Sequence, residues 1–299
     1  MSDEKVTSMH PSPFPRILVF DSGIGGMGIV RALREKSSAL TIDYLADNAL
    51  FPYGEQPDDL LINRVVSLIT QACHILQPDL VIIACNTAST LVLPALRAVL
   101  QQPVVGCVPP IRWAGRVSQT RTIGLLATKA TARRIYVTDL HQQFAPDCRL
   151  IIHGSSKLAE CAELAFRGEK FSAQDVLNEV EQLFSQPGGH SIDTIGLGCT
   201  HYTFLMPTFQ LLEKQNTVTW LDPAPAVADY VLQRLTESPL SHPPSEELRL
   251  SPQRFFATAT PKNSDDLIQH ISWLGFSRWE LFHTPIPTTQ DAQLARLTV

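Results

Sequence analysis

The stretch DLVIIACNTAST, residues 79–90, decides the fold class of this 299-residue chain. Its apolar run has the length of a buried strand, and the asparagine and hydroxyl residues after Cys85 are typical of a helix start. The stretch TIGLGCTHYT, residues 194–203, has the same layout around Cys199. Upstream of each lies another strand that ends in a polar turn, VFDSG (19–23) and LLATKAT (125–131). We infer two similar α/β domains that arose by duplication.

Apolar, strand-like runs alternate with amphipathic, helix-like runs along the rest of the chain. The expected strands are 16–20, 41–46, 79–84, 103–108, 122–127, 150–154, 194–198, 217–221 and 254–259. The expected helices are 27–36, 58–77, one from residue 86, 129–145, 155–167, 173–186, one after residue 199, and 264–273. Such alternation is typical of mainly parallel sheets that are covered by helices on both faces. The predicted fold class is therefore α/β.

The length predicts two domains, at about 150 residues each. We expect a loose N-terminal tail at 1–14, a first α/β domain formed by 15–111 plus 222–299, and a second α/β domain at 112–221. The segment ESPLSHPPSEE, residues 237–247, is rich in Pro and Ser and is predicted to be a linker or a long loop.

Composition and charge exclude several classes of protein. The net charge of −5 gives no sign of a basic nucleic-acid surface. No apolar run reaches the length of a membrane span, and the first residues lack the cationic start and apolar core of a signal peptide. The six cysteines contain no C-x-x-C pair, so neither a disulfide scaffold nor a zinc ribbon is indicated. We expect buried thiols in a reducing cytoplasm, with no nucleic-acid or membrane partner.

A glycine-rich turn follows the first strand. The residues GIGGMG at 23–28 match the G-x-G-x-x-G pattern of dinucleotide-binding proteins, and Asp43 lies 20 residues after Gly23, where an acid that binds a ribose would be. This pattern makes a dinucleotide-dependent oxidoreductase one alternative. Against it, Asp21 and Ser22 stand between the strand and the glycines, and a carboxylate beside a pyrophosphate would be repulsive.

Cys85 and Cys199 each end a predicted strand, where ligands bind in open α/β sheets. The free N–H groups at a helix start can bind a carboxylate and stabilise a thiolate. Two matched thiols could form a disulfide, contribute metal ligands together with His201, or act as a Cys–His nucleophile. A fourth interpretation is proton transfer at a carbon stereocentre. Inversion needs one group to remove a proton and an equal group on the opposite side to supply one.

Five motifs in order make a resemblance specific. DSGIGG (21–26), PYGE (52–55), ACNTAS (84–89), LLAT (125–128) and LGCTHY (197–202) together resemble the cofactor-independent aspartate/glutamate racemase family, and glutamate racemases in particular. The resemblance runs from about residue 16 to 235 and is weaker beyond. It implies a flavodoxin-like sheet in each domain, with the active site in the cleft between them. It also implies conversion of L-glutamate to D-glutamate for peptidoglycan synthesis.

The resemblance implies a role for each residue that matches a motif. Cys85 and Cys199 are the implied catalytic acid/bases, with Asp21 assisting Cys85, and His201 and Glu160 assisting Cys199. The substrate-binding motifs contain Asp21, Ser22, Tyr53, Gly54, Asn86, Thr87 and Thr200, and Thr128 is expected to line the site. No cofactor and no metal are expected. A homodimer and a peptidoglycan-precursor nucleotide as regulator are further expectations about partners.

Two alternatives stay open beside a cofactor-free glutamate racemase. The first is the oxidoreductase indicated by the glycine turn, which would bind NAD(P). The second is a non-catalytic amino-acid-binding protein of the same fold, which would bind its ligand without exchanging the α-proton with solvent.

Overall fold

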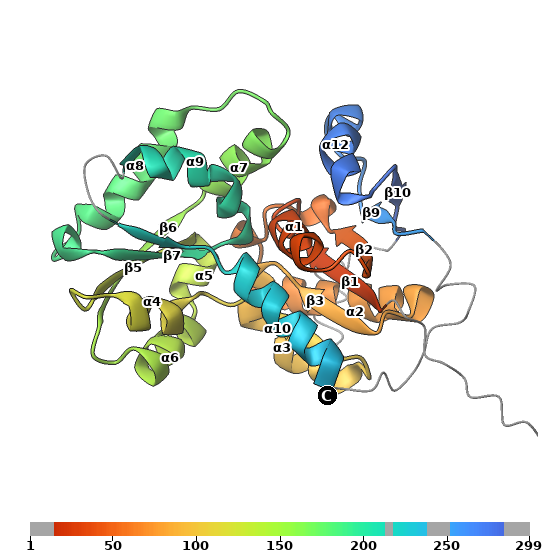
Figure 1. Cartoon of the computed structure of the whole chain (residues 1–299), viewed down its shortest axis with the longest axis horizontal. Coiled ribbons are helices and arrows are strands. Elements are labelled where there is room, and N and C mark those ends of the chain that lie inside the picture. The colour runs from red at the N-terminus through yellow and green to blue at the C-terminus, as the bar shows by residue number, and fades with distance from the viewer. Residues whose placement is uncertain (1–14, 213–217, 238–251, 284–299) are drawn as a thin grey trace, which may run out of the picture.

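Two parallel β-sheets lie side by side in the computed structural model, which describes residues 15–212, 218–237 and 252–283 (Figure 1). The first sheet contains β1 (Arg16–Asp21), β2 (Thr41–Ala46), β3 (Leu80–Ile83), β4 (Val104–Gly106), β9 (Phe255–Ala257) and β10 (Trp279–Leu281). The second contains β5 (Thr122–Thr128), β6 (Arg149–Ser155), β7 (Thr194–Gly198) and β8 (Thr219–Leu221). The predicted α/β class is confirmed.

Helices connect the strands of each sheet. Some α-helices are neighbours in sequence of strands from the first sheet: α1 (Met27–Lys36), α2 (Asp58–Leu76), α3 (Asn86–Val99), α10 (Ala224–Glu237) and α12 (Ser264–Ile271). Those between strands of the second sheet, or just before it, are α4 (Ile111–Val117), α5 (Lys129–Arg133), α6 (Ile135–Phe144), α7 (Leu158–Phe166), α8 (Ala173–Phe184) and α9 (Met206–Phe209). Short 3₁₀ helices are η1 (Asn48–Leu50), η2 (Tyr53–Glu55), η3 (Gly189–Ser191), η4 (Thr200–Leu205), η5 (Gln210–Leu212) and η6 (Ser272–Leu274).

Both sheets share one strand order. The first sheet has the order β10-β9-β2-β1-β3-β4 and the second has the order β6-β5-β7-β8. The order β2-β1-β3-β4 in the first sheet therefore corresponds to β6-β5-β7-β8 in the second, strand by strand. Every described strand pair is parallel. This is the flavodoxin-like order with β9 and β10 added at one edge. Because β1 and β3 correspond to β5 and β7, the residues that follow β3 and β7 occupy matching places.

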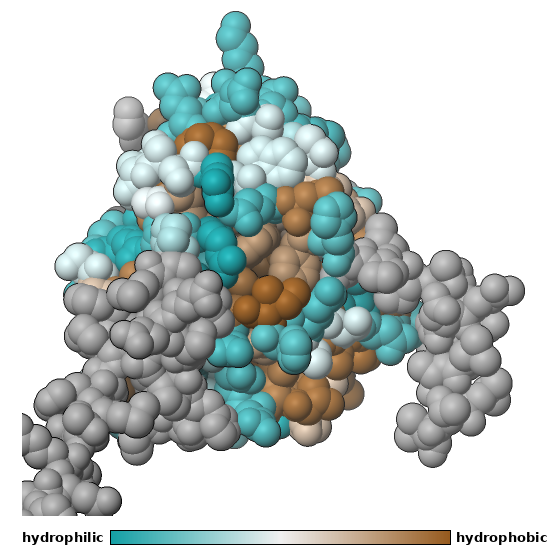
Figure 2. All heavy atoms as spheres, turned by 90° about the vertical axis from the view of Figure 1, so that its right-hand side faces the viewer, coloured by the Kyte–Doolittle hydropathy of each residue, from teal (hydrophilic) through white to brown (hydrophobic). Residues whose placement is uncertain are grey.

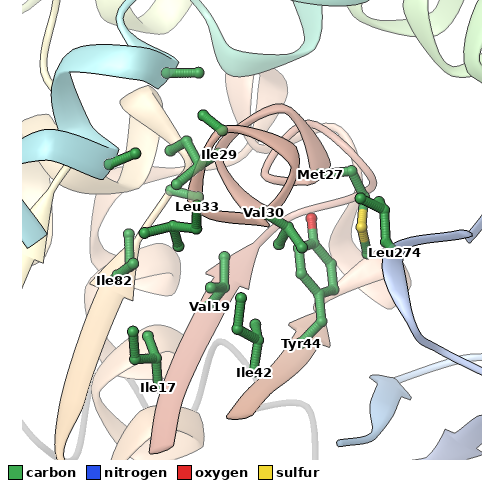
Figure 3. Packing of buried hydrophobic residues seen from close by; sticks show 14 of the residues in the cluster. Ile17, Val19, Met27, Ile29, Val30, Leu33, Ile42, Tyr44, Ile82 and Leu274 are labelled. Carbon is green, nitrogen blue, oxygen red and sulfur yellow. The ribbon is translucent and has the colours of Figure 1, made fainter. Parts of the chain in front are cut away.

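Buried side chains fill the space between helices and sheet. Figure 3 shows α1 packed over the first sheet, with Ile29, Val30 and Leu33 facing Val19 and Ile82. The other face is covered by α2 and α3, so this sheet has a core on both sides. Each fully buried Leu or Ile contributes about 1.5–3 kcal/mol to folding. The second sheet is covered in the same way, by α7 and α8 on one face and α4 and α6 on the other.

Although no apolar run of membrane length was expected, helix α2 is long and apolar enough, by length and composition, to cross a membrane. Its buried residues recur at helical spacing, as in Leu61, Val65, Leu68 and Ala72, and these residues belong to the core of the first sheet. The fully buried Arg64 on the same helix pairs with Asp47. We therefore interpret α2 as a core helix.

The chain passes between the two sheets twice, from β4 to α4 and from β8 to α10 (Figure 1). The domain boundaries at 111/112 and 221/222 stay a prediction. The predicted tail 1–14 lies outside the described residues, as does the predicted linker 237–247 apart from Glu237. Figure 2 shows the end of the molecule that carries β10 and α12, where hydrophobic residues alternate with hydrophilic ones.

Two local predictions were wrong, and some elements were not predicted. The single helix expected at 129–145 is broken at Arg134, whose extended backbone (ψ 134°) separates α5 from α6. The segment after Cys199 is a 3₁₀ helix followed by the four-residue α9, where one helix was expected. Helix α10 and strand β10 were not predicted. Both are edge or connecting elements whose patterns are short or interrupted by proline.

Candidate active site

Each cysteine of the matched pair caps the helix that follows its strand. Cys85 precedes α3 and Cys199 precedes η4, and both residues are only 6% exposed. Because β3 and β7 correspond in the two sheets, the thiols occupy equivalent places at the carboxyl edge of each sheet. Cys85 lies at the start of an α-helix, whose free N–H groups can stabilise a thiolate as expected. The short 3₁₀ helix after Cys199 offers a weaker dipole.

Reciprocal contacts join the two edges. The Thr200 hydroxyl donates to Asp21 Oδ2 at 2.9 Å, and the Thr87 and Thr128 hydroxyls lie 3.0 Å apart. Asp21 ends β1 and Thr128 ends β5, while Thr87 and Thr200 follow the cysteines. Each contact therefore links a strand end of one sheet to the residues just after the cysteine of the other. The two thiol-bearing edges face each other.

A chain of close contacts runs between the thiols. Ser22 Oγ lies 3.9 Å from Cys85 Sγ, and the neighbouring Asp21 Oδ1 lies 3.9 Å from His201 Nδ1. The same His201 Nδ1 lies 3.9 Å from Cys199 Sγ. The charges of Asp21 and of a Cys199 thiolate both bear on the pKa of Cys85. These five residues, all predicted as site residues, are therefore brought together.

His201 is the charged centre of the second thiol's surroundings. Burial alone would lower its pKa, but contacts to Cys199 and Glu163 and the charge of Asp21 raise the pKa well above the ordinary 6.5. Its Nε2 lies 3.1 Å from Glu163 Oε1, and the ring of Phe51 lies 5.4 Å from the imidazole ring, centroid to centroid. The imidazole is therefore held as a cation beside Cys199 at neutral pH.

The first thiol lies in a different electrostatic setting. Burial, followed by the charge of Asp21, raises the pKa of Cys85 far above its ordinary value. Burial also raises the pKa of Asp21, although His201, the Gly23 N–H at 2.9 Å and the Thr200 hydroxyl oppose that effect. Cys85 therefore rests as a neutral thiol next to a carboxylate that can accept a proton.

Glu163 is a carboxylate at the site that the sequence analysis did not single out. Its Oε1 accepts from the Ile24 N–H at 2.9 Å and contacts His201, and its Oε2 accepts from Arg167 at 2.7 Å. His201 and these donors lower its pKa despite burial. Glu160, which was expected to assist Cys199 together with His201, is exposed one turn earlier on α7 and lines the outer cavity described below. The role predicted for Glu160 is one that Glu163 is placed to perform. The sequence signal that could have pointed to Glu163 was its spacing of four residues from Arg167, which is typical of an ion pair on a helix.

The predicted substrate-binding residues surround the thiols in different ways. Asn86 is 1% exposed, its Oδ1 lies 3.8 Å from the Cys107 thiol, and its Nδ2 has no hydrogen-bond partner among the described residues. An orphaned buried N–H₂ is costly unless a ligand accepts from it. Thr87 and Thr128 also contact the Thr131 hydroxyl, at 3.2 and 3.0 Å. This cluster offers hydroxyl groups beside Asn86.

The PYGE motif approaches the site through its backbone. The Tyr53 hydroxyl donates to Asp47 at 2.6 Å. Gly54 lies close to Thr128: a Cβ on this glycine would be only 3.0 Å from Thr128 Cβ. Tyr53 and Gly54 are thus present at the site, with the phenol group committed elsewhere.

The glycine turn has no room for a dinucleotide phosphate. A Cβ on Gly23 would lie 2.3 Å from Glu163 Oε1, and one on Gly25 would lie 2.4 Å from His201 Nδ1. Side chains of the second half therefore occupy the space in front of the turn. Asp43, the acid expected to bind a ribose, is 0% exposed and forms a bidentate pair with Arg16 at 2.7 and 2.9 Å. The structure argues against the oxidoreductase alternative.

A cavity of about 540 Å³ opens beside this turn. It reaches Gly23, Phe51, Glu163 and Arg167, and its outer wall includes residues 259–263. In the described ranges, no group of three or more His, Cys, Asp or Glu side chains is arranged to bind a metal ion. All six cysteines are free thiols.

Fold and site together define a two-sheet α/β enzyme whose candidate reactive groups are a pair of buried thiols. The model of the Asp/Glu/Hydantoin racemase family matches residues 28–231. The glutamate racemase of Granulibacter bethesdensis is 44% identical over 270 residues, covering 88% of this chain and 95% of that protein. The glutamate racemase of Vibrio vulnificus strain YJ016 is 36% identical over 274 residues, covering 92% and 99%.

A solved structure agrees with these relatives. The crystal structure of Escherichia coli glutamate racemase in complex with L-glutamate and the activator UDP-MurNAc-Ala is similar with a TM-score of 0.81 and 31% identity, covering 90% of this chain and 98% of that one. The chain belongs to the aspartate/glutamate/hydantoin racemase family.

Proposed function

We propose that this protein is an isomerase that interconverts L-glutamate and D-glutamate without a cofactor, using Cys85 and Cys199 as the two acid/bases. One observation carries the proposal. Two buried thiols follow corresponding strands of facing sheets, and Ser22, Asp21 and His201 connect them by contacts of 3.9 Å. The match to glutamate racemases over most of the chain supports the choice of substrate.

The reaction moves one proton off Cα and another onto it. A thiolate on one wall takes the Cα proton and becomes a thiol, and the electron pair of the broken C–H bond remains on the substrate as a carbanion. The thiol on the opposite wall then gives its proton to the other face and becomes a thiolate. The reverse reaction exchanges the two roles, so each turnover in one direction prepares the enzyme for the other.

Fixed donors stabilise the negative charge that develops on the substrate. The orphaned Asn86 Nδ2 and the hydroxyls of Thr87 and Thr128 surround the site near Cys85, and Thr200 lies next to Cys199. Donors that are already oriented in a site closed to water stabilise a carbanion without reorganisation. We assign these groups to the substrate carboxylates, and we assign Asp21 to the substrate ammonium or to the Cys85 proton.

The two thiols have different charged neighbours. Cys85 has a strongly raised pKa and is a neutral thiol in the free enzyme, whereas the His201 cation lies beside Cys199. Glu163 balances that cation within the buried site. Negative charge that develops beside Cys199 during the reaction is therefore next to a cation.

Isotope exchange tests this function and its alternatives together. We expect metal-free and cofactor-free enzyme to abolish the optical rotation of L-glutamate and to introduce deuterium at Cα in D₂O, with L-aspartate reacting far more slowly. Binding of glutamate without Cα exchange would identify a non-catalytic binding protein. Faster exchange with L-aspartate would overturn the choice of glutamate.

Regulation by a peptidoglycan-precursor nucleotide is a further part of the proposal. The activator UDP-MurNAc-Ala is bound in the E. coli structure. In this chain a groove of about 630 Å³ lies where the chain passes between the sheets, and its walls include Trp113, Tyr230, Arg112 and Arg116. Aromatic faces and arginines suit a uracil ring and a diphosphate. Addition of the nucleotide is expected to raise the racemisation rate, and Arg116→Ala is expected to weaken that response.

The cellular setting follows from the product. We propose that the enzyme supplies D-glutamate for peptidoglycan in the cytoplasm. Six free cysteines, including the two reactive ones, are consistent with a reducing compartment. Sedimentation of the purified chain tests the homodimer expected from the sequence, and fractionation of cells tests the compartment.

A further inference from the structure

Asp47 is a buried carboxylate outside the proposed reaction that joins four segments of the first half. It follows β2, is 0% exposed, and accepts from Arg64 at 2.8 and 3.0 Å in a two-oxygen fork. The Tyr53 hydroxyl donates to Oδ2 and the Thr258 hydroxyl to Oδ1, each at 2.6 Å. Its backbone N–H donates to the carbonyl of Asp21 at 2.9 Å.

The segment 51–54 next to Asp47 touches both sides of the candidate active site. At one end the Phe51 ring lies 5.4 Å from the His201 ring, on the Cys199 side. At the other end Gly54 packs against Thr128, whose hydroxyl contacts Thr87 on α3, the helix that follows Cys85. We call residues 51–54 the roof segment. Between its two contacts, the Tyr53 hydroxyl ties this segment to Asp47.

We propose that the Asp47–Arg64 pair and the Tyr53 hydroxyl are positioning groups that hold the roof segment over the substrate. This inference rests on the proposed function, since it assigns a role in the same site. None of the three groups needs to touch the substrate. They act by fixing where Gly54 and Phe51 meet the second half of the molecule.

The bonding pattern determines what each change should do. Arg64 and the two hydroxyls occupy the acceptor positions of the Asp47 carboxylate, so Tyr53→Phe removes one charge-assisted bond and keeps the ring in the core. A looser roof weakens substrate binding more than it affects the thiols. We therefore expect Tyr53→Phe to raise KM for glutamate about tenfold, a change on the scale of one hydrogen bond to a charged group, with kcat within about twofold.

The chain offers a matched control in the same sheet. Asp43 and Arg16 form a second buried, two-oxygen pair, with both side chains 1% exposed. Asp43 lies inside β2, opposite Leu18, and its further contact is to Arg254 rather than to the roof segment. Asp43→Asn and Asp47→Asn therefore remove equivalent charges, and only the second touches the roof.

The experiment measures kcat and KM for L-glutamate, together with Tm, for the full-length wild type, Tyr53→Phe, Asp47→Asn, the double variant and Asp43→Asn. We expect both Asp→Asn variants to lower Tm, while KM rises only in Tyr53→Phe and Asp47→Asn. We also expect the double variant to have the KM of Asp47→Asn, because the hydroxyl acts through that carboxylate.

Different failures have different meanings. An unchanged KM in Tyr53→Phe, or an equal rise of KM in Asp43→Asn, overturns the positioning role while wild-type racemisation leaves the proposed function intact. Independent, multiplying effects of the two roof changes also overturn it. Absence of racemisation by the wild type overturns both proposals. If Asp47→Asn fails to fold, Tyr53→Phe still decides the question.

Discussion

At the scale of single residues, the imidazole of His201 connects the protonation of the site to its structure. It lies between Glu163, Asp21 and Cys199, and each of these neighbours favours the cation. Glu163 contacts Nε2 of the imidazole, whereas Cys199 lies near Nδ1, so the ring lies between the carboxylate and this thiol. A substitution of Glu163 should therefore change the pKa of His201 and leave the two thiols in place.

We expect Glu163→Gln to lower the pKa of His201, because the ring loses a carboxylate neighbour. NMR titration of ¹⁵N-labelled histidine should show the His201 midpoint above 6.5 in the wild type and a lower midpoint in the variant. Glu160→Gln is the matched control, since that side chain is exposed on the same helix. An equal shift in both variants would refute the assignment of Glu163.

The same pair should stabilise the protein only within a pH window. The pKa of His201 is raised, so its contribution is complete below the unfolded value of 6.5 and is lost as pH rises through the folded value. The pKa of Glu163 is lowered, so its contribution is present above 4.5 and is lost as pH falls. Denaturant unfolding should show the largest loss for Glu163→Gln near pH 5.5 and a smaller loss at alkaline pH. A loss that does not depend on pH would contradict the ion pair.

The residues nearest the reaction could be predicted from the sequence, and their supports could not. Cys85, Cys199 and Asp21 stand at strand ends within quoted motifs, so the pattern places them at the sheet edge. Glu160 and Glu163 are three positions apart on one helix, and only the packing of α7 against η4 decides which one faces His201. The Asp47 contacts join segments up to 211 residues apart, which no local pattern records.

At the scale of elements, the turn between β1 and α1 works by close packing. Gly25 leaves no space for a side chain, because a Cβ would lie 2.4 Å from His201 Nδ1 and 2.8 Å from Thr200 Oγ1. We expect Gly25→Ala to displace His201 and to reduce kcat/KM by about 100-fold, the scale of a 1 Å misplacement. Steady-state kinetics measures the effect.

Gly124→Ala is the control for this change. It places a Cβ 3.0 Å from Ile195 Cγ1 in the core of the second sheet, away from the turn. We expect the Gly124→Ala variant to keep its racemase activity. Equal kinetics in Gly25→Ala and the wild type would show that the turn does not position His201.

Some elements could be predicted to the residue and others could not, and the expected helix 27–36 matches α1 at both ends. The expected strands 41–46 and 194–198 match β2 and β7 residue for residue. The break in the helix expected at 129–145 coincides with the ion pair that Arg134 forms with Asp58 of α2, 76 residues earlier in the chain. Periodicity within 129–145 contains no information about that partner.

At the scale of the whole molecule, the site exists only where the two halves meet. A ligand that contacts both sheets should stabilise the folded chain, by about 2.7 kcal/mol at 100 times its Kd. We expect thermal unfolding in the presence of glutamate to show a raised Tm, whereas NAD should have no effect because His201 and Glu163 fill the space before the glycine turn. A rise of Tm with NAD would restore the oxidoreductase alternative.

The likeness of the two halves could be inferred from the sequence, but the way the halves face each other could not. Matching motifs predicted equivalent strand ends, and the sheets indeed share one strand order. The reciprocal contacts of Asp21 with Thr200 and of Thr128 with Thr87 depend on the relative placement of the halves. That placement arises from packing over the whole interface.

The most direct measurement follows racemisation from both enantiomers by circular dichroism, for the wild type, Cys85→Ala and Cys199→Ala. The account predicts that either variant loses at least about a thousandfold in rate in both directions, as expected for loss of an acid/base group, while glutamate still raises Tm. Racemisation by either variant at the rate of the wild type would contradict it.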